Sequence, residues 1–376
     1  MRVTLSDPSL ARQAGRFVWL ELNYDEEANQ PFLGRHGISW TPVLLVLDPE
    51  DERVTATHVG GMSLAELQRF LDQGERGFTS KEESGAKAAA SRGDDAVGRG
   101  RLADGAEAYR EALRIGGRRW AGRAQVTDTL VGTLLVQRDD RSCAETAVVV
   151  GPTLPRGPSF ARVAHVGLGC ANSGEGAPWA VAPRKTLESL AAEATTLAGL
   201  PRDDRFQLYQ QLMVAAQLRG AANENVRWGK RWLKEIDAVV PSSDDERSGL
   251  DVARVDVVLL LDQPALALKP LEASERAMPQ NYTSSARLAR VAEAAGRYDE
   301  AVAACERGLR NVDGPIGRSG LLLTKASALR GKGELSQAKA TAELALQEAQ
   351  AIGNEGNRAN TVKRTSDFIA GLDKAR

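Results

Sequence analysis

The 376-residue chain is poor in cysteine and in long apolar runs, and each shortage excludes a class of protein. Its three cysteines cannot all pair, and no two of them are spaced as Cys-x-x-Cys, which argues against a disulfide scaffold and a cysteine-rich zinc site. No apolar run reaches the ~18 residues that a membrane span needs, and the amino terminus has no uninterrupted apolar stretch typical of a signal peptide. The sequence as it stands predicts a cytoplasmic protein.

An excess of positive charge is also missing, because 49 Lys and Arg face 50 Asp and Glu, for a formal charge of -1. A chain without a basic field has no general means of holding the phosphates of a nucleic acid or an anionic membrane surface, so neither is expected as a partner. With 42% hydrophobic and 26% charged residues, the composition is that of a folded soluble protein. The length predicts two domains, or one domain and a repeat array.

Motifs for catalysis and cofactor binding are missing as well. The three histidines, His36, His58 and His165, are too scattered for the H-x-x-x-H or H-E-x-x-H spacing of a zinc site. The glycine-rich stretch 167–172 lacks the third glycine and the preceding strand of a nucleotide-binding loop. The sequence therefore predicts no catalytic residue, no metal and no cofactor.

Residues 1–77 predict an α/β domain. Apart from Glu21, residues 17–22 are apolar on both alternating faces, as expected of an interior strand. Further elements are expected in this order: a helix to about His36, strands at 43–47 and 54–59, and a helix capped by Ser63 with Glu66 in a capping box, ending near Gly74.

The rest of the chain predicts helices only. Residues 78–92 are polar and contain glycine, and they predict a linker. From 93 to 376 the apolar residues follow the helical period, so this part predicts an all-α domain. Acidic pairs such as Asp203 and Asp204 stand where helices are expected to begin, and they are interpreted as helix caps.

An internal repeat marks the all-α part. Gly296 and Ala301 are followed 37 residues later by Gly333 and Ala338. Glycine suits the turn between two helices, and small alanines let the helices pack closely. These residues resemble the tetratricopeptide repeat (TPR) over about 80 residues at the end of the chain and over a shorter stretch near residue 100.

The TPR resemblance implies a solenoid of helical hairpins whose concave face binds a protein or peptide ligand. Trp228 and Trp232 are four residues apart and share a helical face. They either fill the solenoid core or form an aromatic patch that anchors a peptide, because tryptophan is favoured at binding hot spots.

The first 75 or so residues resemble the thioredoxin fold from its first active-site helix onward. The residues that carry the resemblance are the strands at 17–23 and 43–48 and the sequence Trp40-Thr41-Pro42 between them. The resemblance implies that the Thr41–Pro42 peptide bond is cis. It also implies that the loop Trp40, Thr41 and Pro42 contacts a bound peptide or thiol substrate.

Two features of the thioredoxin fold are not found: the redox Cys-x-x-Cys, and the central strand between the strands at 17–23 and 43–48. Without that strand, both neighbours would present an unpaired edge. Three explanations are open. The true start lies upstream of Met1, the two strands close into a degenerate sheet, or a strand from a partner fills the gap.

The leading hypothesis is a non-catalytic protein-binding adaptor, in which an incomplete thioredoxin-like domain is joined to a TPR-like scaffold, as in bacterial-type proteins that fuse the two. The alternative is a thiol-disulfide oxidoreductase whose Cys-x-x-Cys lies upstream of Met1, and such a product could be periplasmic or exported. A third hypothesis is an assembly factor in which the amino-terminal part only caps the helical array.

Overall fold

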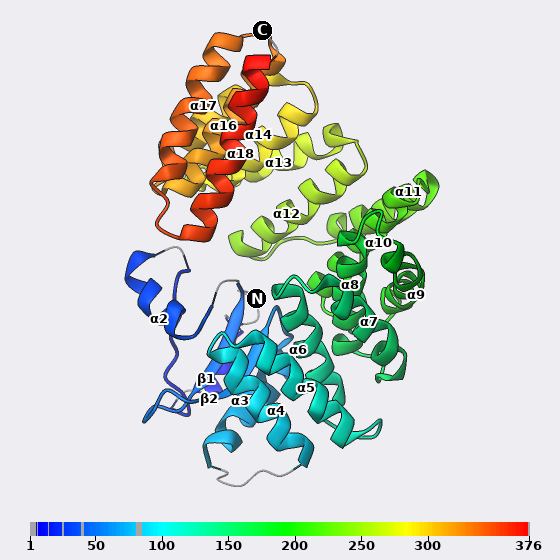
Figure 1. Ribbon diagram of the computed structural model, residues 1–376. Coiled ribbons are helices and arrows are strands. Elements are labelled where there is room, and N and C mark those ends of the chain that lie inside the picture. Colours follow the sequence, from blue (N-terminus) through cyan, green and yellow to red (C-terminus); the bar gives the residue numbers. More distant parts are fainter. Residues whose placement is uncertain are drawn as a thin grey trace. The chain divides into compact units, whose positions relative to one another are not determined.

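The computed structural model is mostly helical (Figure 1). The described residues are 5, 7–13, 15–24, 26–38, 41–79 and 85–374. They divide into two compact units, the first with the residues up to 228 except 25–28, and the second with 25–28 and the residues from 229. The contacts therefore do not divide near residue 77, where the sequence predicts a domain boundary.

The first unit contains a two-stranded antiparallel sheet. Its strands, β1 (Val43–Leu47) and β2 (Val54–Val59), lie where the sequence predicts them. The helices along the chain to residue 218 are η1 (Pro8–Gln13), η2 (Glu27–Asn29), α2 (Gln30–Arg35), α3 (Leu64–Thr79), α4 (Gly85–Gly98), α5 (Leu102–Gly116), α6 (Arg123–Val136), α7 (Asp140–Val150), η3 (Gly151–Thr153), α8 (Pro158–Ser173), α9 (Pro178–Ala194) and α10 (Arg202–Leu218).

The rest of the chain is helical. The helices are α11 (Ala222–Asp237), α12 (Asp244–Leu260), η4 (Pro264–Ala267), α13 (Leu268–Ala277), α14 (Tyr282–Ala294), α15 (Tyr298–Asn311), α16 (Pro315–Gly331), α17 (Leu335–Gln350) and α18 (Glu355–Lys374). Within the described ranges, no helix is long and apolar enough to cross a membrane.

The predicted interior strand at 17–22 is wrong. In this segment only Phe17 makes a β-bridge, and Val18 and Leu20 are 89% and 75% exposed. An interior strand needs a neighbour on each side, and the sheet among the described residues contains β1 and β2 alone. A thioredoxin-like domain is therefore not shown.

Helix α3 covers one face of the sheet and runs past the predicted stop at Gly74. A Cβ atom at Gly74 would lie 2.6 Å from Cγ1 of Val46, so the glycine allows the helix to approach β1 closely and does not end it. The predicted capping box is confirmed: the backbone N–H of Ser63 donates to Glu66 Oε2 at 2.9 Å, and the backbone N–H of Glu66 donates to Ser63 Oγ at 3.4 Å.

The predicted linker at 78–92 is largely helical. Helix α4 begins at Gly85, and its small residues Ala89 and Gly93 are buried. A Cβ atom at Gly93 would lie 2.4 Å from the ring of Tyr109, so this glycine is a packing residue. Small residues on one face of a polar helix let α5 pack against it, and α4 and α5 form a helical hairpin.

Helical hairpins at the positions of the sequence repeat are confirmed in the second unit. Helix α14 pairs with α15, and α16 with α17. Their turns contain Gly296 and Gly333 at φ values of +73° and +82°, which glycine adopts without strain. Ala301 and Ala338 are fully buried, and α16, α17 and α18 lie side by side (Figure 1).

The hairpins of the second unit form two layers that differ in packing. Helices α12, α14, α16 and α18 each contact the next helix of this series. Contacts between α13 and α15, or between α15 and α17, are sparse or absent. The series α12, α14, α16 and α18, hereafter the even layer, is therefore the more closely packed one.

Candidate functional site

The loop that was predicted to contact a substrate leads into β1. The Thr41–Pro42 peptide bond is cis, as predicted, and both residues are exposed. The carbonyl of Pro42 accepts a hydrogen bond from the N–H of Gly60 at 2.9 Å, which ties the loop to the end of β2. Trp40 lies outside the described residues. The binding role of the loop stays a prediction.

Trp228 and Trp232 are core residues of α11, with exposed fractions of 6% and 2%. The ring of Trp228 lies 6.1 Å from that of Tyr209 on α10. The interpretation of the two tryptophans as an exposed peptide-binding patch is therefore wrong. Burying such large rings removes much apolar area from water, which favours the core position.

Two of the three cysteines pair, contrary to the expectation from the sequence. Cys143 of α7 and Cys170 of α8 form a disulfide with their Cα atoms 6.2 Å apart. Their separation of 27 residues matches no motif, and only the packing of α7 against α8 reveals the pair. Cys305 is free and buried, and burial raises the pKa of its thiol to about 12. The chain therefore presents no reactive thiolate.

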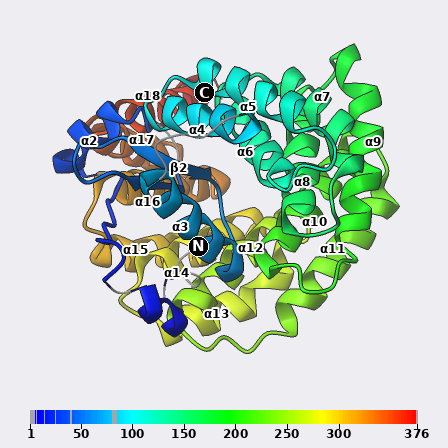
Figure 2. The ribbon, with the colours of Figure 1, turned by 90° about the horizontal axis from the view of Figure 1, so that it is seen from below.

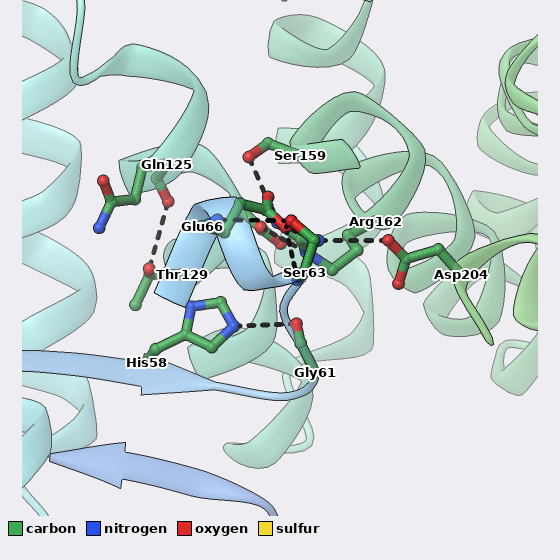
Figure 3. Close-up of polar contacts among 10 residues, drawn as sticks. His58, Gly61, Ser63, Glu66, Gln125, Thr129, Ser159, Arg162 and Asp204 are labelled. Carbon is green, nitrogen blue, oxygen red and sulfur yellow. Dashed lines mark hydrogen bonds and ion pairs between the residues drawn. The ribbon is translucent and has the colours of Figure 1, made fainter. Parts of the chain in front are cut away.

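A buried cluster of charged side chains lies where α3, α6, α8 and α10 meet (Figure 3). We call Arg162, Glu66, Asp128 and Asp204 the Arg162 cluster. The guanidinium of Arg162 donates from Nε to Asp128 Oδ2 at 2.7 Å, from Nη2 to Glu66 Oε1 at 2.5 Å, and from Nη1 to Asp204 Oδ2 at 3.3 Å. Arg162 therefore joins α8 to three other helices.

Local structure positions each carboxylate of the cluster. The capping box holds Glu66, because Ser63 Oγ–H also donates to its Oε2, at 2.7 Å. Asp204 is in the first turn of α10, which lies beside α8 (Figure 2). Its interpretation as a helix cap is wrong, since Pro201 is the N-cap residue and the Asp204 carboxylate accepts from Arg162.

Three carboxylates around one guanidinium leave an excess of negative charge in a largely dry site. Burial raises the pKa of Asp204 to about 7, and the charges of Asp128 and Glu66 add to the rise against the attraction of Arg162. Burial also acts to raise the pKa of Glu66, but the hydrogen bonds and charge of Arg162 outweigh it, and that pKa is lowered. Asp204 is therefore the carboxylate that takes up a proton near neutral pH.

Two histidines lie close to the cluster. Burial lowers the pKa of His58 on β2, and its Nε2–H donates to the carbonyl of Gly61 at 3.1 Å (Figure 3). Burial and the charge of Arg162 lower the pKa of His165 on α8. Both rings are therefore neutral at physiological pH.

Relative to the wild type, the Asp204→Asn variant should gain stability as pH rises from about 4 to about 7, and the difference should stay constant above about 7. The folded chain binds the Asp204 proton more tightly than the unfolded chain does, because the pKa of this carboxyl is about 7 when folded and 3.8 when unfolded. The stability that this proton contributes is fully present below pH 3.8 and is lost as pH rises through about 7. The expected difference in stability grows by on the order of 1 kcal/mol per pH unit between about pH 4 and pH 7, and it levels off above pH 7, where Asp204 is ionised in both states.

Urea unfolding of both proteins between pH 5 and 9 measures this difference. His58 and His165 act in the opposite direction, because unfolded histidine takes up a proton below about pH 6.5, but their contribution cancels between the two proteins. Asp203→Asn, at the exposed neighbouring carboxylate, is the matched control. A stability difference for Asp204→Asn that does not change with pH would contradict the assignment.

The geometry of the cluster favours a structural role. A carboxylic acid with a pKa near 7 is suited to proton transfer, but the four side chains of the cluster are only 6–12% exposed. None of the four lines either of the two pockets described below. The Arg162 cluster is therefore a clamp that holds α3, and with it the sheet, to α6, α8 and α10.

Two pockets are lined by both charged and apolar residues. One, of about 600 Å³, lies among β2, α3, α4 and α5. Its three basic residues are paired: Arg53 with Asp48 at 3.4 Å, Arg92 with Glu111 at 2.5 Å, and Arg101 with Asp95 at 3.1 Å. A smaller one, of about 310 Å³, lies among α13, α14 and α15. No group of three His, Cys, Asp or Glu in the described part of the chain is arranged to hold a metal ion.

No family model matches the chain, and no curated protein matches it significantly. Among solved structures, it is similar to a tetratricopeptide repeat protein from Parabacteroides merdae, with 11% identity and a TM-score of 0.47, over 75% of this chain and 98% of that one. It is also similar to the TPR2AB domain of yeast Sti1 in its pHSP90 complex, with 13% identity and a TM-score of 0.30, over 77% of this chain and 98% of that one. Both TM-scores are below 0.5, so these similarities are not evidence for the fold. The evidence for the helical hairpins is the contacts between helices within the chain itself.

Proposed function

We propose that the chain is a non-catalytic, protein-binding scaffold in which the even layer of the second unit contacts a segment of a partner. In this proposal the residues around β1 and β2 are an incomplete thioredoxin-like domain that the Arg162 cluster holds to the first unit. The observation that carries the proposal is the unequal packing of the two helical layers. A layer whose helices are closer together forms the inner, concave side of a stack of hairpins, and such surfaces bind extended protein segments.

The even layer carries polar side chains that suit recognition. Ser327 Oγ–H of α16 donates to Glu293 Oε1 of α14 at 2.7 Å, which links two helices of the layer. Burial raises the pKa of Asp256 on α12, and the charge of Arg290 on α14 opposes the rise, so these two side chains are near one another. Arg290 itself is exposed, and within the described part of the chain no hydrogen bond or ion pair is found for its guanidinium. The planar guanidinium of Arg290 can donate two parallel hydrogen bonds to a carboxylate of a partner.

The charge reversal Arg290→Glu should weaken partner binding at least tenfold, because it places a negative charge where the proposal expects a partner carboxylate. The matched control is Arg310→Glu, which reverses an exposed arginine on α15, outside the even layer. A partner is captured from an extract of the native source with the full chain as bait and purified, and its Kd is measured for the three proteins. Equal affinities for the two variants would contradict the proposal.

A further inference from the structure

The first unit contains an exposed apolar segment. Val18, Trp19 and Leu20 are consecutive and are 89%, 46% and 75% exposed. The preceding residue, Phe17, packs against the hydrophobic cluster that includes Val46 of β1. The segment therefore leaves the protein core beside the sheet with three large apolar side chains in water. Contiguous exposure of this kind marks an interaction site.

Strand β1 has an open edge. In the antiparallel ladder, the carbonyl of Pro42 and the N–H of Asp48 point toward β2, where they bond to Gly60 and Arg53. Because hydrogen-bonded and non-hydrogen-bonded pairs alternate, the backbone N–H and C=O of Val43 and Leu45 point away from β2. No bond to these four groups comes from the described residues.

The geometry limits what can cover this edge. Backbone donors and acceptors that alternate at the spacing of a strand are satisfied by another extended backbone. All five residues of β1 are aliphatic, and the nearby segment exposes valine, tryptophan and leucine. The side chains of an added strand are therefore expected to be apolar in its middle.

Charge specifies the ends of the added strand. In the first unit, residues 17–24 and 29–52 contain five carboxylates and one arginine, a balance of -4 in a chain of net charge -1. The arginines just outside these ranges are already paired, Arg16 with Asp72 and Glu75, and Arg53 with Asp48. Basic flanks would complement this region, whereas a second copy of the chain would bring the same negative charge to the edge.

We propose that β1 is extended at its outer edge by a strand of a partner protein, with apolar residues at its centre and Lys or Arg at both ends. The backbone of this strand bonds to Val43 and Leu45, and its side chains cover Val18 and Leu20. The proposal does not depend on the even layer, since either surface can bind its partner without the other.

The first test uses a synthetic peptide, Lys-Arg-Val-Thr-Ile-Thr-Val-Arg-Lys, and a control in which Glu and Asp replace the basic ends. Isothermal titration with the full chain should show binding of the basic peptide that weakens as NaCl rises, and at least tenfold weaker binding of the acidic one. The Val18→Ser/Leu20→Ser double variant should bind the basic peptide at least tenfold more weakly than the wild type. The exposed residues Val149 and Val240 give the matched control, Val149→Ser/Val240→Ser, which should change the Kd less than twofold.

Amide hydrogen exchange gives the backbone signature of the proposal. On saturation with the basic peptide, exchange at Val43 and Leu45 should slow at least tenfold, while exchange at Leu44, which already faces β2, should not change. Absence of binding, equal binding of the two peptides, an unaffected serine variant, or unchanged exchange at Val43 and Leu45 would each overturn the proposal. A dimer in sedimentation that Val18→Ser/Leu20→Ser abolishes would overturn it in favour of a second copy at this edge.

Discussion

The variant Arg162→Met should lower the free energy of unfolding of the first unit by about 3–5 kcal/mol at pH 8. Methionine removes the cation but keeps most of the volume, so the carboxylates of Glu66, Asp128 and Asp204 are left facing one another in a site that is nearly closed to water. Unpaired buried charge is among the most costly changes to a folded protein. The loss should be smaller at pH 5, where Asp204 carries a proton.

Urea denaturation followed by circular dichroism measures the effect. The matched control is Arg141→Met, which removes an arginine that pairs with Glu145 at 2.8 Å while both side chains are more than half exposed. Such a surface pair contributes about 0.3–0.5 kcal/mol. Similar losses for Arg162→Met and Arg141→Met would show that the Arg162 cluster does not hold the first unit together. Limited proteolysis gives a second readout: the sheet residues should be cleaved off faster in Arg162→Met than in the wild type, and equal rates would contradict the account.

Loss of the disulfide should destabilise the first unit by about 3.5 kcal/mol. This is the free energy that corresponds to the entropy lost when the disulfide closes a loop of about 27 residues in the unfolded chain. The bond joins Cys143 and Cys170, 27 residues apart, across the contact between α7 and α8. The double variant Cys143→Ala/Cys170→Ala should therefore unfold at lower urea concentration than the untreated wild type. A reducing agent should bring the wild type down to the stability of the variant and leave the variant unchanged.

Cys305 supplies the control for this experiment, since it is buried and unpaired. The variant Cys305→Ala should respond to the reducing agent as the wild type does. A thiol titration of the unreduced protein in denaturant should find one free thiol. Three free thiols, or a wild type indifferent to the reducing agent, would contradict the disulfide.

Local signals predicted the local structure of the chain well. The strands at 43–47 and 54–59, the capping box at Ser63, and the hairpin turns at Gly296 and Gly333 are all found. Each of these features depends on residues that are neighbours in sequence. The helix through Gly74 and the helix in the predicted linker were not predicted, because a glycine that permits close packing has the same sequence signal as one that ends a helix.

Features that depend on distant contacts could not be predicted from the sequence. Arg162 and Glu66 are 96 residues apart, and no motif links them. The one local signal for the cluster was an arginine between buried apolar residues of α8, Ala161 and Val163. The strand predicted at 17–22 failed for the same reason, because its apolar pattern indicates a strand while its pairing depends on a neighbour that the described sheet does not contain.

The central claim is that the even layer contacts a partner protein. Photocrosslinking from chosen helix positions tests this claim most directly. A photoreactive phenylalanine analogue replaces Arg290 or Ser327 in the even layer, and Arg310 or Leu344 on α15 or α17 as matched controls. After irradiation of the full chain in an extract of its native source, positions 290 and 327 should give crosslinks to the same protein, and positions 310 and 344 should not. Equal crosslinking from all four positions, or crosslinks from 310 and 344 alone, would contradict the account.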